Sequence, residues 1–224
     1  MNILVSGPGG VRTDFVQQYL IRMLNPDVQQ SWNIDSYTGR TIQNKNPGNY
    51  PGKYQVYKEH SGLKRISEFQ WVLSRREDML DDYDKAIYIL HDHTDIEQCV
   101  KRAWEHIVKS FMFNSAEKLT VQEMCKKIEH ECEVSLHGNN GVTISGASTV
   151  TLADMLNDNG WQILQNVLGM NFPEHAKHIW QVALSRSHSP DEVYYRGKLF
   201  TKNHVRSRVN YHHAKRQEFY QNKN

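Results

Sequence analysis

The sequence of 224 residues predicts an α/β fold with a mainly parallel sheet between two layers of helices, a three-layer α/β/α arrangement. Short β-prone runs alternate with segments of helical periodicity over most of the chain. The run Lys85–Leu90 (KAIYIL) is apolar and β-branched, as in a strand buried on both faces. A glycine-rich turn also follows the first strand and precedes a helix. Because ligands of such sheets bind at the carboxyl ends of the strands, we expect a site at this turn.

The N-terminal half is expected to contain four strands and two helices. Gly7, Pro8, Gly9 and Gly10 form the first turn, and apolar residues recur at helical spacing after it. A stretch rich in Gly, Pro and Asn predicts a long loop, which is typical of functional segments. The elements are a strand Asn2–Ser6, a helix Val11–Leu24, a strand Trp32–Tyr37, the loop Thr38–Lys53, a strand Tyr54–Lys58, a helix Ile66–Leu80 and the strand Lys85–Leu90.

The C-terminal half is expected to be mostly helical. Thr94 or Asp95 is a suitable cap for a long helix, Thr151 begins a later one, and Gly169 is a good C-cap. The elements are helices at 94–113 and 121–132, a strand Val142–Ser145, and helices at 152–156, 161–168 and 173–184. We expect one α/β domain over residues 1–201 and a basic tail over residues 202–224 that is helical or partly disordered.

The composition indicates a soluble globular protein, with 38% hydrophobic, 10% aromatic and 23% charged residues. No apolar run approaches the roughly 20 residues of a membrane span, and the N-terminus lacks the layout of a signal peptide. We therefore expect a cytoplasmic protein with no membrane partner. Cys99, Cys125 and Cys132 show no paired metal spacing, which predicts reduced, unpaired thiols.

The formal net charge of +2 is unevenly distributed. Residues 196–224 contain eight Lys and Arg against Glu218 alone, so this segment carries +7 and residues 1–195 carry −5. Such a basic segment can bind nucleic acid, fold over a phosphate bound elsewhere, or form a solvated helix.

The glycine turn has the local geometry of an anion site, because a helix that follows such a turn directs free N–H groups toward it. Read as a P-loop, Ser6–Thr13 has Arg12 in place of the lysine and Thr13 as the Mg²⁺-binding hydroxyl, but lacks both framing glycines. Read as a dinucleotide fingerprint, it lacks the third glycine, although Asp35 lies at a suitable distance for a ribose-binding acid. A purely structural tight turn is the remaining alternative.

The order of three motifs resembles the sulfotransferases that use 3′-phosphoadenosine-5′-phosphosulfate. These motifs are the glycine turn, a strand that ends in Lys58-x-His60, and the KAIYIL strand with its polar turn and long helix. The resemblance covers residues 1–110 and continues more weakly to Arg196-Gly197-Lys198. It implies a fold like that of the P-loop nucleoside triphosphate hydrolases. It also implies transfer of a sulfuryl group to a hydroxyl of a small molecule or glycan, without a metal.

The resemblance assigns roles to individual residues. His60 would be the general base for the acceptor hydroxyl, and Lys58 would stabilise charge on the transferring group. At the family's 3′-phosphate positions the chain departs from the pattern, with His91 for Arg and Cys99 for Ser. The expected cofactor-binding residues are Gly7, Gly9, Gly10, Val11, Arg12, Thr13, His91, Cys99, Arg196, Gly197 and Lys198.

Other functions remain open from the residues alone. The first is a P-loop kinase or another enzyme that binds a nucleoside triphosphate. The second is a non-catalytic protein that binds phosphate or nucleic acid through the turn or the basic tail. His91-x-His93 has the character of a metal site, but residues on a polar turn at this spacing are more often simply solvated.

Overall fold

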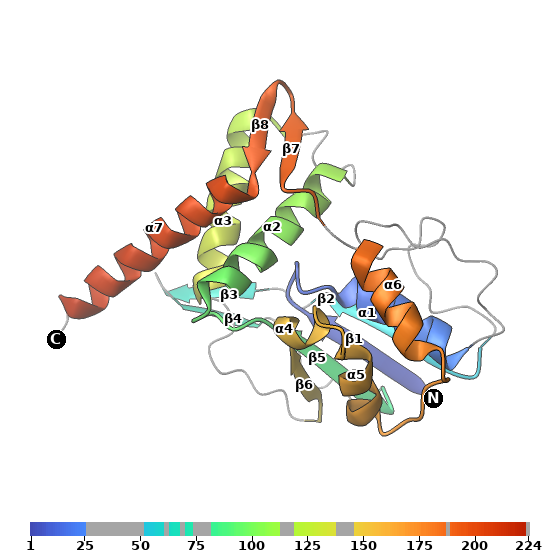
Figure 1. Ribbon diagram of the computed structural model, residues 1–224. Coiled ribbons are helices and arrows are strands. Elements are labelled where there is room, and N and C mark those ends of the chain that lie inside the picture. Colours follow the sequence, from blue (N-terminus) through green and yellow to red (C-terminus); the bar gives the residue numbers. More distant parts are fainter. Residues whose placement is uncertain are drawn as a thin grey trace. The chain divides into compact units, whose positions relative to one another are not determined.

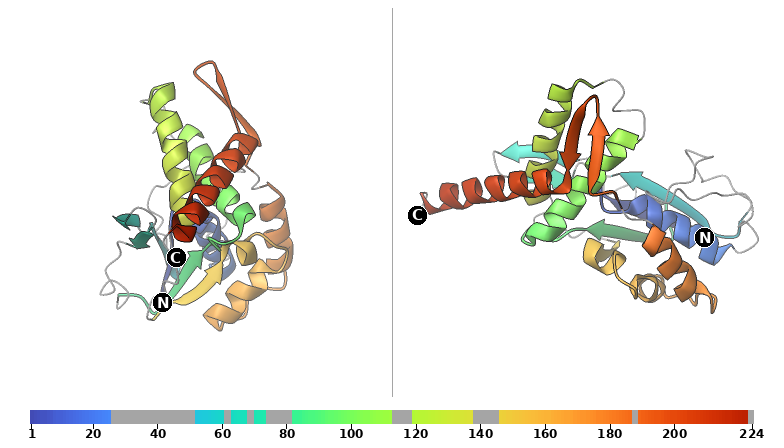
Figure 2. Two further views of the ribbon diagram at one scale, coloured as in Figure 1. Left: turned by 90° about the vertical axis from the view of Figure 1, so that its left-hand side faces the viewer. Right: turned by 45° about the horizontal axis from the view of Figure 1, so that its top comes forward.

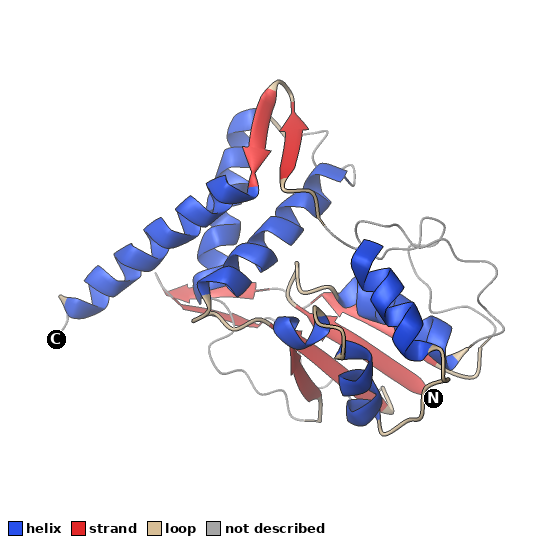
Figure 3. Ribbon diagram, viewed as in Figure 1, coloured by secondary structure: helices blue, strands red, loops and turns tan. Residues whose placement is uncertain are grey.

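The computed structural model describes residues 1–25, 52–60, 63–67, 70–73, 82–112, 119–137, 146–186 and 189–222. Contacts within the chain divide it into two compact units, each made of three segments (Figure 1). Unit 1 comprises Met1–Ser61, Arg75–Leu90 and Thr143–His188, and unit 2 comprises Gly62–Ser74, His91–Val142 and Ser189–Asn224. Unit 1 contains a parallel sheet with helices, whereas unit 2 contains long helices and two hairpins (Figure 3).

The described part of unit 1 is built on a four-stranded parallel sheet with the order β2-β1-β5-β6. These strands are β1 (Asn2–Gly7), β2 (Gln55–His60), β5 (Lys85–Leu90) and β6 (Ser148–Thr151). In the central strands β1 and β5, the residues from Ile3 to Gly7 and from Ala86 to Ile89 are buried, although successive side chains alternate between the two faces of the sheet. The α/β class, the mainly parallel sheet and the buried KAIYIL strand are thereby confirmed, and both faces of the sheet are covered, in agreement with a three-layer arrangement.

Helices α1 (Thr13–Leu24), α4 (Leu152–Met155), α5 (Gly160–Leu168) and α6 (Ala176–Arg186) contribute to one apolar cluster with the sheet. Trp180 of α6 is wholly buried, and its ring meets those of Phe15 and Tyr19 edge-on at centroid distances of 4.9 and 4.7 Å. Thr151 begins α4 through a capping box with Asp154, and Gly169 ends α5 with a φ of 58°. Both helix boundaries are as predicted.

Unit 2 is formed around α2 (Ile96–Met112), α3 (Val121–His137) and α7 (Lys202–Gln221), which lie side by side (Figure 2). Their apolar faces share one cluster that includes Trp104 and Ile107 of α2 and Val205 of α7. Asp95 caps α2, since its Oδ1 accepts hydrogen bonds from the N–H groups of Glu97 and Gln98. The hairpin of β7 (Glu192–Tyr195) and β8 (Lys198–Thr201) adds Phe200 to the same cluster.

One expectation for secondary structure needs correction. The helix expected at Ile66–Leu80 is wrong over its described residues, where β3 (Leu63–Ser67) and β4 (Gln70–Leu73) form an antiparallel hairpin. The β-branched and aromatic residues of this run favour strands, and pairing between the strands outweighed the helical spacing. Besides β1, the strand β5 pairs with Ser148–Thr151, which was not predicted as a strand from the sequence. The expected strands at 142–145 and 32–37, and most of the expected loop at 38–53, lie outside the described residues.

Candidate functional site

The glycine turn joins β1 to α1 at the carboxyl end of the sheet. A Cβ on Gly7 would lie 2.5 Å from the carbonyl oxygen of Ile89 and 2.7 Å from Cγ2 of Val11. Gly10 has a φ of 91°, in the region that favours glycine. Gly7 is therefore required for close packing against β5, and Gly10 for the direction of the turn.

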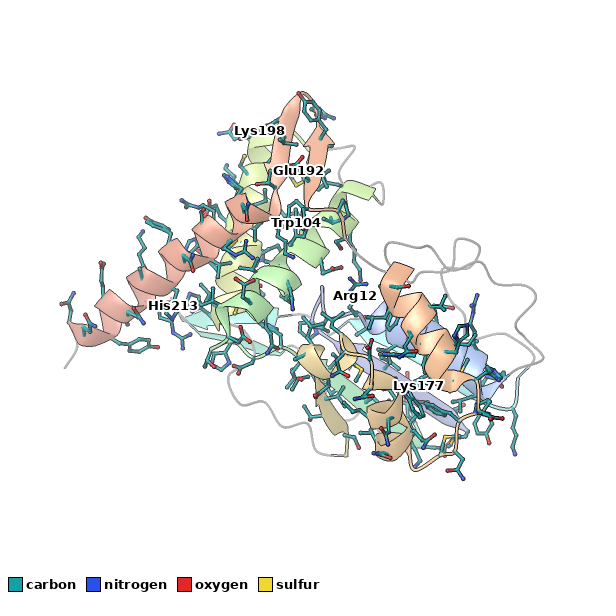
Figure 4. The ribbon with its side chains drawn as sticks, viewed as in Figure 1. Arg12, Trp104, Lys177, Glu192, Lys198 and His213 are labelled. Carbon is teal, nitrogen blue, oxygen red and sulfur yellow. The ribbon has the colours of Figure 1, made fainter. Side chains whose placement is uncertain are left out.

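The N-terminus of α1 combines a positive backbone terminus with a buried cation. Arg12 occupies the N-cap position with a left-handed backbone (φ 66°) and makes no side-chain cap hydrogen bond. The first N–H groups of a helix have no acceptor within the helix, so they can bind an anion. Arg12 and Thr13 are 3% and 1% exposed. Figure 4 shows Arg12 beside the start of α1. The loop can thus offer backbone donors, a hydroxyl and a guanidinium.

The register of β1 and β2 brings the two predicted motifs of unit 1 to the same edge. Lys58 pairs with Val5, and His60 pairs with Gly7, where the glycine turn begins. Because the strands are parallel and adjacent, the end of β2 lies next to the loop. Lys58 and His60 occupy alternate positions of β2 and so belong to one face. The side chain of His60 lies outside the described part of the chain.

Asp14 binds the predicted catalytic lysine, and sequence reasoning missed this residue. The ammonium of Lys58 forms an ion pair with Oδ1 of Asp14, with side chains that are 21% and 3% exposed. One turn later, Nε2 of Gln17 donates to the carbonyl oxygen of Val56 at 2.9 Å. These two contacts attach α1 to β2. The only signal in the sequence was an acid in the first turn of the helix, because its partner is set by tertiary packing.

The arrangement in unit 1 is suited to binding an anion. Arg12 and Lys58 provide two positive charges, and Asp14 provides one negative charge. The α1 N-terminus adds a partial positive charge. Asp14 also fixes the position of the Lys58 ammonium at this terminus. Salt screens a partly buried ion pair only weakly. The Asp14–Lys58 pair therefore holds the Lys58 ammonium in one position at the site.

His91 and Cys99, expected at the 3′-phosphate, lie in the interior of unit 2. Nε2 of His91 and Sγ of Cys99 are 2.7 and 3.2 Å from the same carbonyl oxygen, that of Ser135. Burial, together with the charge of Arg102, lowers the pKa of His91 to about 4, and burial raises the pKa of the Cys99 thiol to about 12. Both groups are neutral at pH 7, and Nε2 donates to the carbonyl. These contacts favour a structural role, and binding of the cofactor by this pair stays a prediction.

Arg196, Gly197 and Lys198 also belong to unit 2, at the tip of the β7–β8 hairpin. Arg196 and Gly197 have φ values of 47° and 79°, the backbone of a two-residue hairpin turn. The Lys198 ammonium lies 3.4 Å from Sγ of Cys125. Figure 4 labels Lys198 on this hairpin. Their sequence is explained by the turn, and their assignment to the cofactor also stays a prediction.

Neither a metal-binding cluster nor a membrane-spanning helix occurs in the described part of the chain. No group of His, Cys, Asp and Glu among the described residues is placed to hold a metal ion. No helix in the described ranges is long and apolar enough to cross a membrane. No family model matches the chain, and comparisons with curated proteins and with solved structures found no match.

Proposed function

We propose that the protein transfers a sulfuryl group from 3′-phosphoadenosine-5′-phosphosulfate to a hydroxyl acceptor, at the carboxyl edge of the sheet in unit 1. The observation that carries the proposal is the register of β1 and β2, which aligns Lys58 with Val5 and His60 with Gly7. The glycine turn and the Lys-x-His motif, which are about 50 residues apart in the sequence, thereby come to adjacent strand ends.

The loop would bind the phosphosulfate end of the donor. The N–H groups at the start of α1 and the hydroxyl of Thr13 would donate hydrogen bonds to its oxygens. The guanidinium of Arg12 would contribute charge-assisted contacts, which are roughly twice as strong as neutral hydrogen bonds. The 3% exposure of Arg12 supports this role, because a cation shielded from water interacts more strongly with an anion.

His60 and Lys58 would carry the chemical step. An imidazole at the end of β2 takes the proton from the acceptor hydroxyl as its oxygen forms a bond to sulfur. The bond between sulfur and the bridging phosphate oxygen breaks, and its electron pair remains on the 5′-phosphate. The Lys58 ammonium stabilises this developing charge. Asp14 positions the ammonium, so that little reorganisation is needed during the reaction.

A phosphoryl transferase is the second candidate, and Thr13 favours it. Its hydroxyl stands at the start of α1, where P-loop enzymes place the residue that binds Mg²⁺. The two candidates differ in the nucleotide and in the requirement for the metal. Sulfuryl transfer requires a 3′-phosphate and no metal, whereas phosphoryl transfer requires a triphosphate with Mg²⁺.

Calorimetric titration distinguishes the two candidates. The wild-type protein is titrated with 3′-phosphoadenosine 5′-phosphate, and separately with ATP and GTP, each with and without Mg²⁺. We expect the 3′-phosphorylated nucleotide to bind at least about tenfold more tightly than ATP, independently of Mg²⁺. The Lys53→Ala variant is the control, since this exposed lysine precedes β2 at the opposite end from the site. Tighter, Mg²⁺-dependent binding of ATP or GTP would overturn the proposal in favour of phosphoryl transfer.

A further inference from the structure

Helix α7 consists of an anchored first half and a second half with few contacts. Val205 and Val209 are its buried residues. The guanidinium of Arg206 binds both carboxylate oxygens of Glu97 at 2.9 and 2.8 Å, and Arg208 binds Glu129 at 2.8 Å. The positive charges of the first half are therefore neutralised by carboxylates of α2 and α3. They hold the helix in place and offer little to a partner.

The second half of α7 keeps hydrogen-bond contacts with α3, from His212 to Glu129 and from Arg216 to the carbonyl oxygen of Leu136, both at 2.8 Å, and it extends beyond α3 after them. From Val209 to Gln221 its length is about 18 Å, at 1.5 Å per residue. The right-hand view of Figure 2 shows this end of α7 continuing past α2 and α3. Figure 4 labels His213 on this half. Because the first half is fixed by ion pairs and burial, the second half is a firmly held, solvent-exposed rod.

Exposed tyrosines and cations lie together on this rod. Tyr211 and Tyr220 are 43% and 48% exposed, which is unusual for side chains of this size. The Arg208 guanidinium and the Lys215 ammonium lie 4.6 and 4.7 Å from the centre of the Tyr211 ring, and the Arg216 guanidinium lies 5.8 Å from the centre of the Tyr220 ring. Each tyrosine is thus paired with a cation one turn away.

In the first half of α7, carboxylates neutralise the charges of Arg206 and Arg208. Among the described residues, the structure gives no such ion pair for Lys215 and Arg216 in the exposed second half. Arg216 donates to the carbonyl oxygen of Leu136 at 2.8 Å, a neutral acceptor that leaves the positive charge in place. Lys215 is exposed, and Glu218 is the one acidic residue in the sequence of α7. The rod therefore has a positive field and aromatic rings but no continuous apolar face.

We propose that the exposed half of α7 binds single-stranded nucleic acid, with bases stacked on the tyrosines and phosphates next to Lys215 and Arg216. Every base offers a π-face to an aromatic ring, and cations beside that ring neutralise the adjacent phosphates. A lipid surface fits less well, because a membrane-binding helix needs a broad apolar face and this half has none. This inference concerns unit 2 and is independent of the transferase proposed for unit 1.

The test is fluorescence anisotropy of a labelled 20-nucleotide oligo-dT with the full-length protein, over a series of salt concentrations. We expect Tyr211→Ala to weaken binding about tenfold, and Tyr211→Phe to retain it, because stacking needs the ring and not the hydroxyl. Lys215→Ala should weaken binding and reduce the salt slope by about 0.7, the value for one phosphate contact on a single strand. Neither exposed side chain is needed for folding, and circular dichroism of each variant verifies this.

Two further measurements keep the inference falsifiable. Inorganic polyphosphate, which has charge but no bases, should compete much less well than unlabelled oligo-dT. Vesicles with phosphatidylserine should not displace the oligonucleotide. Equal competition by polyphosphate, displacement by the vesicles, or equal affinity of Tyr211→Ala and wild type would each overturn the inference.

Discussion

The two units use buried charge in different ways. In unit 1, the Asp14–Lys58 pair lies at the end of a strand, beside a helix N-terminus, and Lys58 retains 21% exposure of its side chain. In unit 2, Arg102 and Glu131 form a 2.8 Å ion pair whose side chains are 3% and 5% exposed. The Nδ1 atom of His106 lies 2.8 Å from the other carboxylate oxygen of Glu131.

The two ion pairs differ in whether a ligand can reach them. The Asp14–Lys58 pair is accessible to a ligand, whereas the Arg102–Glu131 pair stabilises the fold. Arg102 also donates to the hydroxyl of Ser135 at 3.1 Å, so its polar surroundings come from α3. Such a network is costly to disrupt, and the Arg102 and Glu131 side chains within it are buried. The pair in unit 1 borders a helix terminus that attracts anions, and the Lys58 side chain is 21% exposed. For this reason we propose the site in unit 1, although the described part of unit 2 contains the more deeply buried ion pair.

The largest expected effect comes from removing Glu131. Glu131→Gln leaves the Arg102 guanidinium buried without a counter-charge, and we expect a loss of about 3–5 kcal/mol in the free energy of unfolding. Urea denaturation followed by circular dichroism measures it. Glu129→Gln is the matched control, because the Glu129 side chain is 35% exposed and should cost about 1 kcal/mol or less. A similar, small loss for both variants would show that the buried network is not structural.

Acid should weaken unit 2 in two stages. Burial lowers the pKa of His91 from 6.5 to about 4. Between these pH values His91 is therefore protonated in the unfolded chain but neutral in the folded chain. Stability should fall by about 3 kcal/mol over this range. Below pH 4.5 it should fall further, because Arg102 and His106 hold the pKa of Glu131 at about 2. Denaturation at a series of pH values measures both stages.

The matched variants for the acid effect are His91→Gln and His204→Gln. Glutamine at position 91 should reduce the dependence between pH 6.5 and 4, whereas the same change at the exposed His204 should leave it in place. His93 and His106 also contribute to this dependence, because burial lowers the pKa of both. If both variants behave as the wild type does, the buried His91 does not control acid stability.

A smaller effect is expected at the glycine turn. Gly7→Ala introduces a methyl group 2.5 Å from a backbone oxygen of β5. Because the backbone of a central strand cannot move aside as a flexible side chain can, we expect a loss of about 1–3 kcal/mol in the free energy of unfolding. At Gly146, where an added Cβ would meet no atom within 4 Å and the φ is 80°, alanine should cost about 1 kcal/mol from backbone strain alone. Thermal denaturation compares the two, and an equal loss would mean that Gly7 is not tightly packed.

The smallest effect should come from the exposed ion pair of α7. Arg206→Gln removes two hydrogen bonds to Glu97, but both side chains are well exposed, at 36% and 54%. We expect a loss of less than about 1 kcal/mol, and still less at high salt. Urea denaturation at low and high salt measures this loss. A loss above about 2 kcal/mol would show that Arg206 stabilises the fold as strongly as a member of the buried Arg102–Glu131 network.

Local signals predicted much of unit 1. The apolar run Lys85–Leu90 fixed the central strand, and Gly169 and Thr151 fixed helix boundaries, because each depends on neighbours in the sequence. The Asp14–Lys58 pair could not be predicted, since it depends on how α1 packs on β2. The alternation around Arg196-Gly197 was a hairpin signal, but these residues were interpreted as a ligand motif.

The cations of unit 1 are proposed to bind a nucleotide, and a binding measurement tests this most directly. The quantity is the dissociation constant of 3′-phosphoadenosine 5′-phosphate, measured by calorimetry for the wild type and for the double variant Asp14→Asn/Lys58→Met. The double variant removes both members of the ion pair together, so neither is left without the other. We predict binding that is at least about tenfold weaker, with an unchanged unfolding midpoint. An unchanged dissociation constant would show that these charges do not bind the nucleotide.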